Sequence, residues 1–386
     1  MGGKMNYVLY GDGTHDDYPA IQEMLDGGDA EVVLPLPQKN YLISKTLKIH
    51  SNQKLKLPRF AKILLAPNAN CSMIENDTSA PCEGVFLSGG VWDMNHSAQL
   101  PNPYRFPQGK TYEQQCKDFG WTEYDKSLFP GYSGHCMRFC GINNFELKNI
   151  TIVNPVVYGV QLAFVENFTV KNIVFDYTEG SPKLWNMDGV HLEGGCKNGY
   201  INNLKGACHD DLVAITSDDS IRGPIENIAI DGIFAENCHS AVRLLSAATP
   251  VKNISINNVF GSYYVYCITL SKYIDINGNR GKFSNVTINN VFASFCKGTK
   301  DVAGNYYAFI QIDKGLDVEN LSISNVFRDE KVCFTPTIGI CEDTTIKNMS
   351  LHNVRQSAPD GAEMQFIKNE GCLLSLDSGN TGYKEN

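Results

Sequence analysis

Three aspartates precede two short apolar runs near the middle of the chain. Asp188 leads into Val190-His191-Leu192, and Asp210-Asp211 leads into the run at 212–215. Carboxylates that stand close together repel each other, and this repulsion separates their pKa values. One carboxyl can then remain protonated and act as an acid while another acts as a base. Whether these aspartates meet depends on whether the chain returns on itself at the interval that separates them.

A strand-like template recurs between residues 145 and 354. Its copies combine alternating apolar residues with β-branched residues and asparagine, and self-similarity of this period is typical of a solenoid. The segments between the copies show no helical periodicity, so the solenoid is built from strands. We therefore predict an all-β fold, a parallel β-helix. We align the copies on an asparagine at positions 149, 172, 203, 227, 253, 285, 320 and 348.

Several of these asparagines stand in Asn-x-Ser/Thr sequences. The template itself places a serine or threonine two residues after the asparagine, so glycosylation is not needed to explain the pattern. We interpret these residues as asparagines stacked at the corners of successive coils. They are Asn149, Asn253, Asn285, Asn320 and Asn348.

The first part of the chain contains a predicted helix followed by short strands. Residues 16–19 combine acids with a proline, as at the start of a helix, and Gly27-Gly28 ends it. The helix has one apolar face, and we predict that it caps the open core of the solenoid within an N-terminal cap of about residues 1–30. Strands are predicted at residues 31–34, 41–43, 46–49, 54–57 and 62–65.

We expect a single domain over residues 1–386, interrupted by an aromatic-rich loop insertion at about residues 95–135. A long loop of this kind inside a compact domain is usually functional. Two roles remain open for it. Its rings could form the wall of a carbohydrate site, or they could cover the side of the coils.

Net charge and hydropathy limit the classes of partner. The net charge is −9, whereas nucleic acids and anionic membranes bind basic surfaces. The first residues lack the apolar stretch of about 7–15 residues of a signal peptide, and no run approaches the ~18 apolar residues of a membrane span. We expect neither nucleic acid nor membrane as a partner. The localisation stays open between the cytoplasm and export with the signal removed.

The inward-pointing apolar residues set the phase of the strands around the aspartates. If Val190, Val213 and Val242 are the first inward residues of consecutive coils, Asp188 and Asp211 take equivalent places two residues earlier. An unpaired carboxylate in the core is very costly. We therefore predict that the aspartates lie on an outer bend as an exposed cluster. The flanking residues would be His191, His209, His239 and Arg243.

The residue pattern alone leaves three interpretations of this cluster. It could be catalytic, it could bind calcium, or its acids could be corner residues that accept hydrogen bonds from backbone amides. A second acid pair, Asp218-Asp219, lies in a polar turn, and we interpret it as structural.

The order and spacing of these motifs resemble the polygalacturonase family, family 28 of the glycoside hydrolases. Asn186-Met187-Asp188-Gly189 is similar to the family's Asn-Thr-Asp-Gly, and residues 209–215 are similar to its Gly-Asp-Asp-Cys-Ile-Ala-Ile. Cys238-His239-Ser240 stands where the family has Gly-His-Gly, and Val242-Arg243-Leu244 resembles the start of its Arg-Ile-Lys segment. Weaker likeness at residues 89–93 and at the N-terminus extends the resemblance over about residues 8–275.

The resemblance implies an inverting glycoside hydrolase, a divergent member of the family, on a right-handed single-stranded parallel β-helix without metal or cofactor. Asp210 would protonate the leaving oxygen, while Asp188 and Asp211 would activate a water on the opposite face. His239 would tune the protonation of the acid. The implied substrate-binding residues are Arg243, His191, His209 and Asn186.

Departures from the family pattern leave the substrate open. Leu245 occupies the place of the lysine that, with an arginine, would hold a uronate carboxylate, and His191 and His209 replace residues that the family usually has as Asp and Gly. A pectin-like galacturonan, a rhamnogalacturonan and a neutral or mixed glycan all remain candidates.

Two other functions fit the same fold. A polysaccharide lyase would need bound calcium or a neutralising cation together with a base. A tailspike-like β-helix would bind glycan without cleaving it. In each case we expect a carbohydrate partner and a monomer or weak oligomer.

Overall fold

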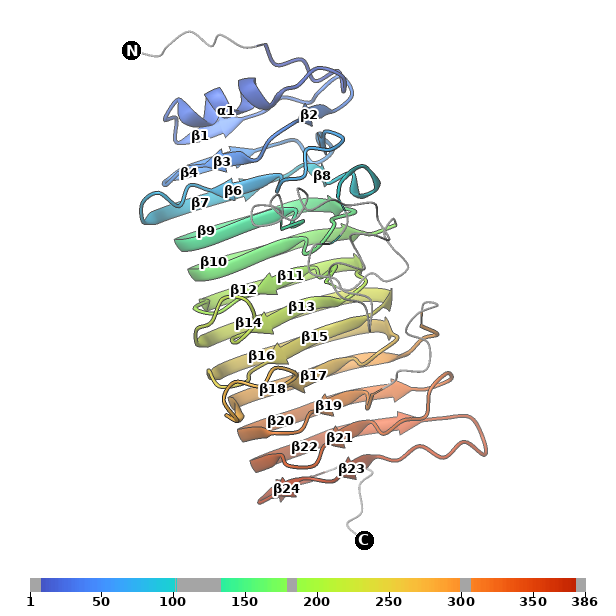
Figure 1. Ribbon diagram of the computed structural model, residues 1–386. Helices are drawn as coiled ribbons and strands as arrows, with labels where there is room; N and C mark the ends of the chain where they lie inside the picture. Colours follow the sequence, from blue (N-terminus) through green and yellow to red (C-terminus); the bar gives the residue numbers. More distant parts are fainter. Residues whose placement is uncertain (1–7, 101, 103–132, 179–185, 299–306, 380–386) are drawn as a thin grey trace, which may run out of the picture.

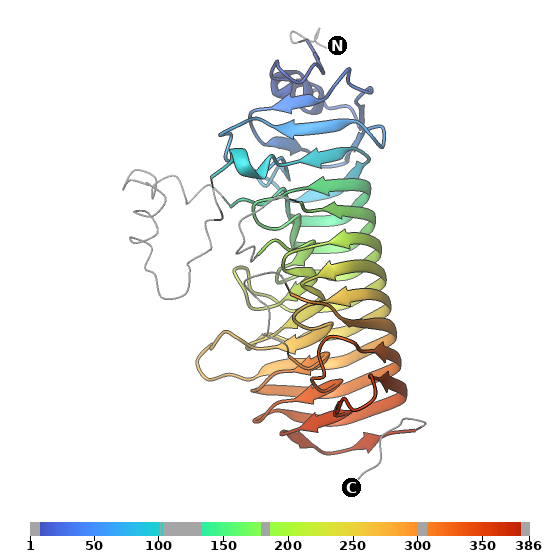
Figure 2. The same cartoon turned by 90° about the vertical axis from the view of Figure 1, so that its right-hand side faces the viewer.

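The chain winds into a right-handed parallel β-helix (Figure 1). The repeat predicted the parallel β-helix, and the family resemblance implied its right hand. The computed structural model describes residues 8–100, 102, 133–178, 186–298 and 307–379. Figure 2 shows the coils stacked along one axis, with the N-terminal coils in blue at one end and the C-terminal coils in red at the other. Most of the aromatic-rich insertion and both ends of the chain lie outside the described residues.

The N-terminal coils contain only short strands, whereas long and short strands alternate in the later coils from β10 to β23. The helix is α1 (Tyr18–Asp26), and a 3-10 turn follows at His96–Ala98. The strands before the insertion are β1 (Glu31–Val33), β2 (Tyr41–Ile43), β3 (Leu47–Ile49), β4 (Gln53–Lys56), β5 (Lys62–Leu65), β6 (Ile74–Asn76), β7 (Cys82–Ser88) and β8 (Val91–Asp93).

The strands after the insertion are β9 (Met137–Val153), β10 (Val160–Asp176), β11 (Val190–Leu192), β12 (Lys197–Ala207), β13 (Asp211–Thr216), β14 (Ile225–Cys238), β15 (Ser240–Leu245), β16 (Val251–Tyr263), β17 (Ile268–Ser271), β18 (Gly281–Phe295), β19 (Ile310–Ile312), β20 (Leu316–Asp329), β21 (Ile338–Ile340), β22 (Thr345–Ser357), β23 (Ile367–Asn369), β24 (Cys372–Leu373) and β25 (Leu376–Asp377). The predicted strands of the first part differ from the observed ones by one residue at most at either end.

Parallel pairing repeats from coil to coil and forms continuous stacks of strands. One stack runs from β1 through β4, β7 and β9 to β22. A second stack, referred to below as the site sheet, runs through β11, β13, β15, β17, β19, β21 and β23. A given position therefore lies directly beside its equivalents in the neighbouring coils.

The core is a set of apolar columns inside the coils. Each column holds residues that pair in register, so every buried side chain packs on its equivalent above and below. Burial of such a side chain contributes roughly 1.5–3 kcal/mol, and the column repeats this contribution in every coil. One fully buried column consists of Leu147, Val170, Ile201, Ile230, Ile256, Ile288, Ile323 and Leu351.

Asparagine side chains stack at the corners, as predicted, but they form two ladders instead of one. The longer ladder joins Asn143, Asn167, Asn198, Asn227, Asn253, Asn285, Asn320 and Asn348 by side-chain hydrogen bonds of 2.7–3.1 Å. The second ladder begins with Asn149, Asn172 and Asn203.

Our alignment of the repeat was therefore wrong in its first three copies. In register, Asn203 lies beside Gly232, whereas Asn227 lies beside Asn198. The slip has a physical cause. Asparagine occupies two corners of the same arc because both need a left-handed backbone, with φ of 58° at Asn253 and 59° at Asn258. A template with asparagine at both ends fits either corner.

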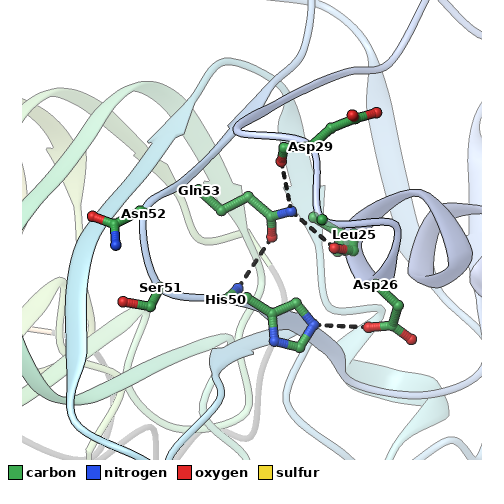
Figure 3. A pocket seen from close by; sticks show the side chains of 8 residues that line it. Leu25, Asp26, Asp29, His50, Ser51, Asn52 and Gln53 are labelled. Carbon is green, nitrogen blue, oxygen red and sulfur yellow. Dashed lines mark hydrogen bonds and ion pairs between the residues drawn. The ribbon is translucent and has the colours of Figure 1, made fainter. Parts of the chain in front are cut away.

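The helix α1 lies against the first coil and buries Ala20, Ile21 and Leu25 in the core. Polar contacts attach its end to the next coil (Figure 3). The Gln53 amide donates to the Leu25 and Asp29 carbonyls at 2.8 and 3.1 Å, and His50 Nε2 lies 2.7 Å from Asp26. These residues line a cavity of about 330 Å³. The helix thus covers the N-terminal end of the core, as predicted.

Within the described part of the chain, no helix has the length and apolarity that crossing a bilayer requires.

Candidate active site

The three aspartates lie where consecutive coils enter the site sheet. Val190 pairs with Val213, and the Gly189 N–H donates to the Asp211 carbonyl at 3.0 Å. Asp188 and Asp211 therefore occupy equivalent positions on adjacent coils. The phase predicted for β11, β13 and β15 is confirmed.

Glycine beside Asp188 permits this close stacking. A Cβ at Gly189 would lie 2.5 Å from the Leu212 carbonyl oxygen and 3.0 Å from the Phe175 ring. The Tyr177 hydroxyl donates to the Asp188 carbonyl at 2.9 Å. The backbone that carries this carboxylate is thus held from both sides by adjacent coils.

The prediction of an exposed cluster is wrong. Asp188 is 1% exposed, Asp211 is 0% exposed and Asp210 is 8% exposed. Tyrosines from neighbouring coils help to bury the cluster. Tyr158 stacks on the ring of His191, and the Tyr266 hydroxyl donates a hydrogen bond to Asp211. A buried carboxylate is costly without partners. Each of the three has a different set of them.

Asp188 is held by an imidazole. Its Oδ2 lies 2.6 Å from His191 Nδ1, while its Oδ1 is buried without a hydrogen-bond partner among the described residues. Burial raises the pKa of Asp188 to about 7, and the negative charge of Asp210 adds to this effect, although the hydrogen bond with His191 opposes it. Part of the cluster can therefore hold a proton near neutral pH.

Asp211 is held by a cation and two hydroxyl groups. Its Oδ1 accepts hydrogen bonds from the Tyr266 hydroxyl at 2.7 Å and from the Ser240 hydroxyl. Its Oδ2 lies 2.8 Å from Arg243 Nε, and neither of these two atoms has a hydrogen-bond partner among the described residues, so the contact is an ion pair without a directed hydrogen bond. The Arg243 guanidinium also lies over the Tyr273 ring, 5.4 Å from its centroid.

Asp210 is the most accessible of the three. Its Oδ2 accepts the backbone N–H of Asn186 at 2.6 Å, and its Oδ1 lies 3.7 Å from His239 Nδ1. Asn186 adopts a left-handed φ of 62°. The His239 side chain is 14% exposed. Asp210 and His239 thus form the solvent-facing side of the cluster.

Asp210, Asp211 and His239 each offer a ligand atom, and these atoms lie within 4.8 Å of one another. Carboxylate oxygens and an imidazole nitrogen can hold a divalent ion at this spacing. The Arg243 guanidinium already supplies a positive charge beside Asp211.

Residues 132–259 match the family model of the glycosyl hydrolases family 28. The match covers about a third of the chain. All three aspartates, His239 and Arg243 lie within the matched segment. The chain therefore has a family 28 glycoside hydrolase fold with an aspartate cluster on the site sheet.

Solved structures with the same fold include hydrolases and an adhesin. The family 28 exopolygalacturonase of Yersinia enterocolitica shares 16% identity over 94% of this chain and 77% of that chain, with a TM-score of 0.56. The endo-xylogalacturonan hydrolase of Aspergillus tubingensis shares 16% identity over 96% of this chain and 98% of that chain, with a TM-score of 0.61.

The surface adhesin PfbA of Streptococcus pneumoniae shares 17% identity over 95% of this chain and 92% of that chain, with a TM-score of 0.53. At these identities the likenesses show the fold alone. A search of curated proteins finds no match.

The residues expected to bind substrate do not share one environment. The His191 ring is fully buried, and both of its nitrogens contact protein atoms. His209 is partly buried near Tyr177, and burial lowers its pKa. Arg243 is engaged by Asp211 and Tyr273, and Asn186 contributes its backbone N–H to Asp210.

Leu245, which replaces the family's lysine in our sequence comparison, is also fully buried and so adds neither charge nor an exposed contact.

Sequence reasoning missed the residues that surround the acids. Tyr158, Ser240 and Tyr266 stand in the same column as Asp188 and Asp211, two residues before the first inward residue of their coils. Reading the residue at the same position in the coil before Asp188 and in the two coils after Asp211 would have found all three.

Asp218 and Asp219 have different environments. Asp218 accepts the backbone N–H groups of residues 247–249, as expected of a structural turn. Asp219 instead accepts a hydrogen bond of 3.1 Å from the Tyr273 hydroxyl, beside Arg243. No sequence signal separated the two.

Proposed function

We propose that this protein is an inverting glycoside hydrolase that acts on a pectin-like or mixed plant-type polysaccharide or oligosaccharide. The observation that carries the proposal is the aspartate cluster on the site sheet, in which three carboxylates from two adjacent coils have three different sets of partners. Different partners give carboxyl groups different protonation states, which acid and base catalysis requires.

Asp210 is the proposed general acid. It is the most accessible of the three, and His239 lies beside its Oδ1. In the proposed step the proton of Asp210 passes to the glycosidic oxygen as the bond from that oxygen to the anomeric carbon breaks. A water oxygen bonds to the anomeric carbon from the opposite face and its proton passes to a base carboxylate, Asp188 or Asp211.

The spacing of the carboxylates bears on the stereochemistry. Inverting enzymes separate their two carboxyl groups by roughly 6.5–9.5 Å, and retaining enzymes by roughly 5–5.5 Å. Oxygens of Asp210 and Asp211 approach within 4.8 Å. Both oxygens of Asp211 are engaged, by the Tyr266 hydroxyl and by Arg243, whereas Asp188 Oδ1 has no hydrogen-bond partner among the described residues, so Asp188 is the better candidate for the base.

The test is digestion of a panel of pectic and neutral glycans by the wild type and by Asp210→Asn. We expect the substitution to lower kcat by about a hundredfold to ten-thousandfold, the usual contribution of a general acid. The matched control is Asp176→Asn, an exposed aspartate at the end of β10. Proton NMR of the first product formed should show the anomer opposite to that of the substrate.

Hydrolysis that survives Asp210→Asn would remove Asp210 from the role of acid. A product that keeps the anomeric configuration would overturn inversion.

Glycan binding without cleavage is the second candidate function. The burial of the three aspartates and the likeness of the fold to that of an adhesin favour it. It predicts that the wild type binds a glycan of the panel and releases no product from it.

A lyase would instead form an unsaturated product that absorbs ultraviolet light, and its activity would be lost on chelation of calcium.

A further inference from the structure

The imidazole of His191, on β11, lies between two buried carboxylates, one before the strand and one after it. His191 Nδ1 lies 2.6 Å from Asp188 Oδ2, and His191 Nε2 lies 3.6 Å from Glu193 Oε1. All three side chains are at most 1% exposed. Two buried acids next to one another repel unless a positive charge or a proton separates them.

The surrounding hydrogen bonds fix where the protons of this group lie. The Thr216 hydroxyl donates to the Leu192 carbonyl at 2.9 Å, so its single hydrogen is used there. The same hydroxyl oxygen lies 3.0 Å from His191 Nε2 and must accept a hydrogen bond from it. His191 therefore carries a proton on Nε2, and a second proton lies between Nδ1 and Asp188.

Glu193 is itself fixed by donors on its far side. Its Oε1 accepts from the Gln161 amide at 3.2 Å and from the Ser220 hydroxyl at 2.5 Å, and its Oε2 accepts the Ile221 N–H at 3.1 Å. A carboxylate with these donors remains an acceptor and favours a positive charge on the neighbouring imidazole.

Other groups also face this imidazole. The Tyr158 ring stacks on it at 3.8 Å, with His135 stacked beyond Tyr158, and Asp219 contributes a negative charge. Burial lowers the pKa of His191, but the hydrogen bond and charge of Asp188, together with Glu193 and Asp219, outweigh burial and raise it overall. Asp210 and Asp211 face Asp188 on its other side.

We propose that His191 is a positioning residue for the catalytic base. It holds Asp188 by Oδ2, opposes the protonation of that carboxylate that burial and Asp210 favour, and leaves Oδ1 as the oxygen that accepts the proton of the attacking water. The proposal rests on the proposed hydrolase function, in which Asp188 is a base. It gives His191 a role different from the substrate contact implied by the family resemblance.

The arrangement of protons can be tested without substrate. In the wild type, nitrogen-15 NMR of the His191 ring should show Nε2 protonated from pH 5 to pH 9. In Glu193→Gln the pKa of His191 should fall, because one of the two flanking charges is lost. A neutral ring with unprotonated Nε2 at pH 7 in the wild type would overturn the inference, whatever the protein cleaves.

The kinetic test uses a glycan that the wild type cleaves. His191→Asn retains a neutral donor near Asp188, and His191→Ala does not. We expect kcat to fall about tenfold in His191→Asn and further in His191→Ala, with KM changed less than twofold. The acidic limb of the pH profile of kcat/KM should move to higher pH in both, because the base loses its cationic partner. His352→Asn, an exposed histidine on β22, is the control.

Circular dichroism of each variant verifies that it is folded. A raised KM with unchanged kcat and an unmoved acidic limb would make His191 a substrate contact and overturn the positioning role, while the hydrolase function would stand. If no glycan is cleaved by the wild type, the hydrolase proposal fails and the NMR result alone decides the protonation of His191.

Discussion

At the scale of single residues, the partners of the three aspartates matter more than their spacing. Asp188 has an imidazole, Asp211 has a guanidinium with two hydroxyls, and Asp210 has a backbone N–H. Repulsion separates the proton affinities of acids placed together, and differences in their surroundings decide which of them keeps the proton. The repeat was enough to predict the positions of these acids on the sheet, but the residues that cover them come from coils up to 55 residues away. Burial was therefore the property that could not be predicted.

The raised pKa of Asp188 has a consequence for stability. The pKa is about 7 in the folded chain against 3.8 for an ordinary aspartate. The folded chain therefore binds a proton on Asp188 more tightly than the unfolded chain does. The protonated carboxyl stabilises the fold at low pH, and this stabilisation is lost as the pH rises from about 4 to about 7. Asp188→Asn removes this dependence.

We therefore expect the free energy of unfolding of Asp188→Asn, relative to the wild type, to increase as the pH rises through that window, by at most about 1.4 kcal/mol per pH unit. Urea unfolding at pH 4.5, 6 and 7.5 measures it, and Asp176→Asn should show no such trend. A difference that stays constant between pH 4.5 and 7.5 would show that Asp188 does not hold a proton in the folded chain.

At the scale of elements, corner asparagines combine two contributions. Asn253 adopts a left-handed φ of 58°, and its amide donates to Asn227 while its oxygen accepts from Asn285, both at 2.8 Å. The left-handed backbone conformation at this corner favours glycine or asparagine, and the two side-chain hydrogen bonds favour asparagine alone. The alternation of apolar residues predicted the strands and the inward columns, but asparagine at both corners made the first copies of the repeat ambiguous.

Two substitutions separate these contributions. Asn253→Gly keeps the backbone conformation and loses the two hydrogen bonds, so it should lower the free energy of unfolding by roughly 1–2 kcal/mol. Asn253→Ala also forces a Cβ into the left-handed region and should cost about 1 kcal/mol more. Chemical unfolding measures both. Equal losses in the two variants would mean that the left-handed corner carries no strain for alanine.

At the scale of the whole molecule, the solenoid has two ends, and an uncovered end exposes both core and strand edge. Each coil contacts only its neighbours, so terminal caps are needed to keep such proteins soluble. The helix α1 supplies the N-terminal cap, with Ile21 and Leu25 fully buried on the first coil. The apolar face of this helix and its two glycines were enough to predict the cap from the sequence, because the pattern is local.

Ile21→Asp should detach this cap. A carboxylate at a fully buried position is costly, and loss of the isoleucine packing alone costs roughly 2–5 kcal/mol. The first strands would then present apolar side chains and unpaired backbone groups, which favour edge-to-edge association. We expect light scattering after gel filtration to show self-association at micromolar concentration and thermal unfolding to begin at lower temperature.

The control, Lys39→Asp, places a carboxylate at an exposed site and should leave both measurements unchanged. If Ile21→Asp elutes in the oligomeric state of the wild type with the same onset of unfolding, α1 is an appendage and the first coil is stable without it.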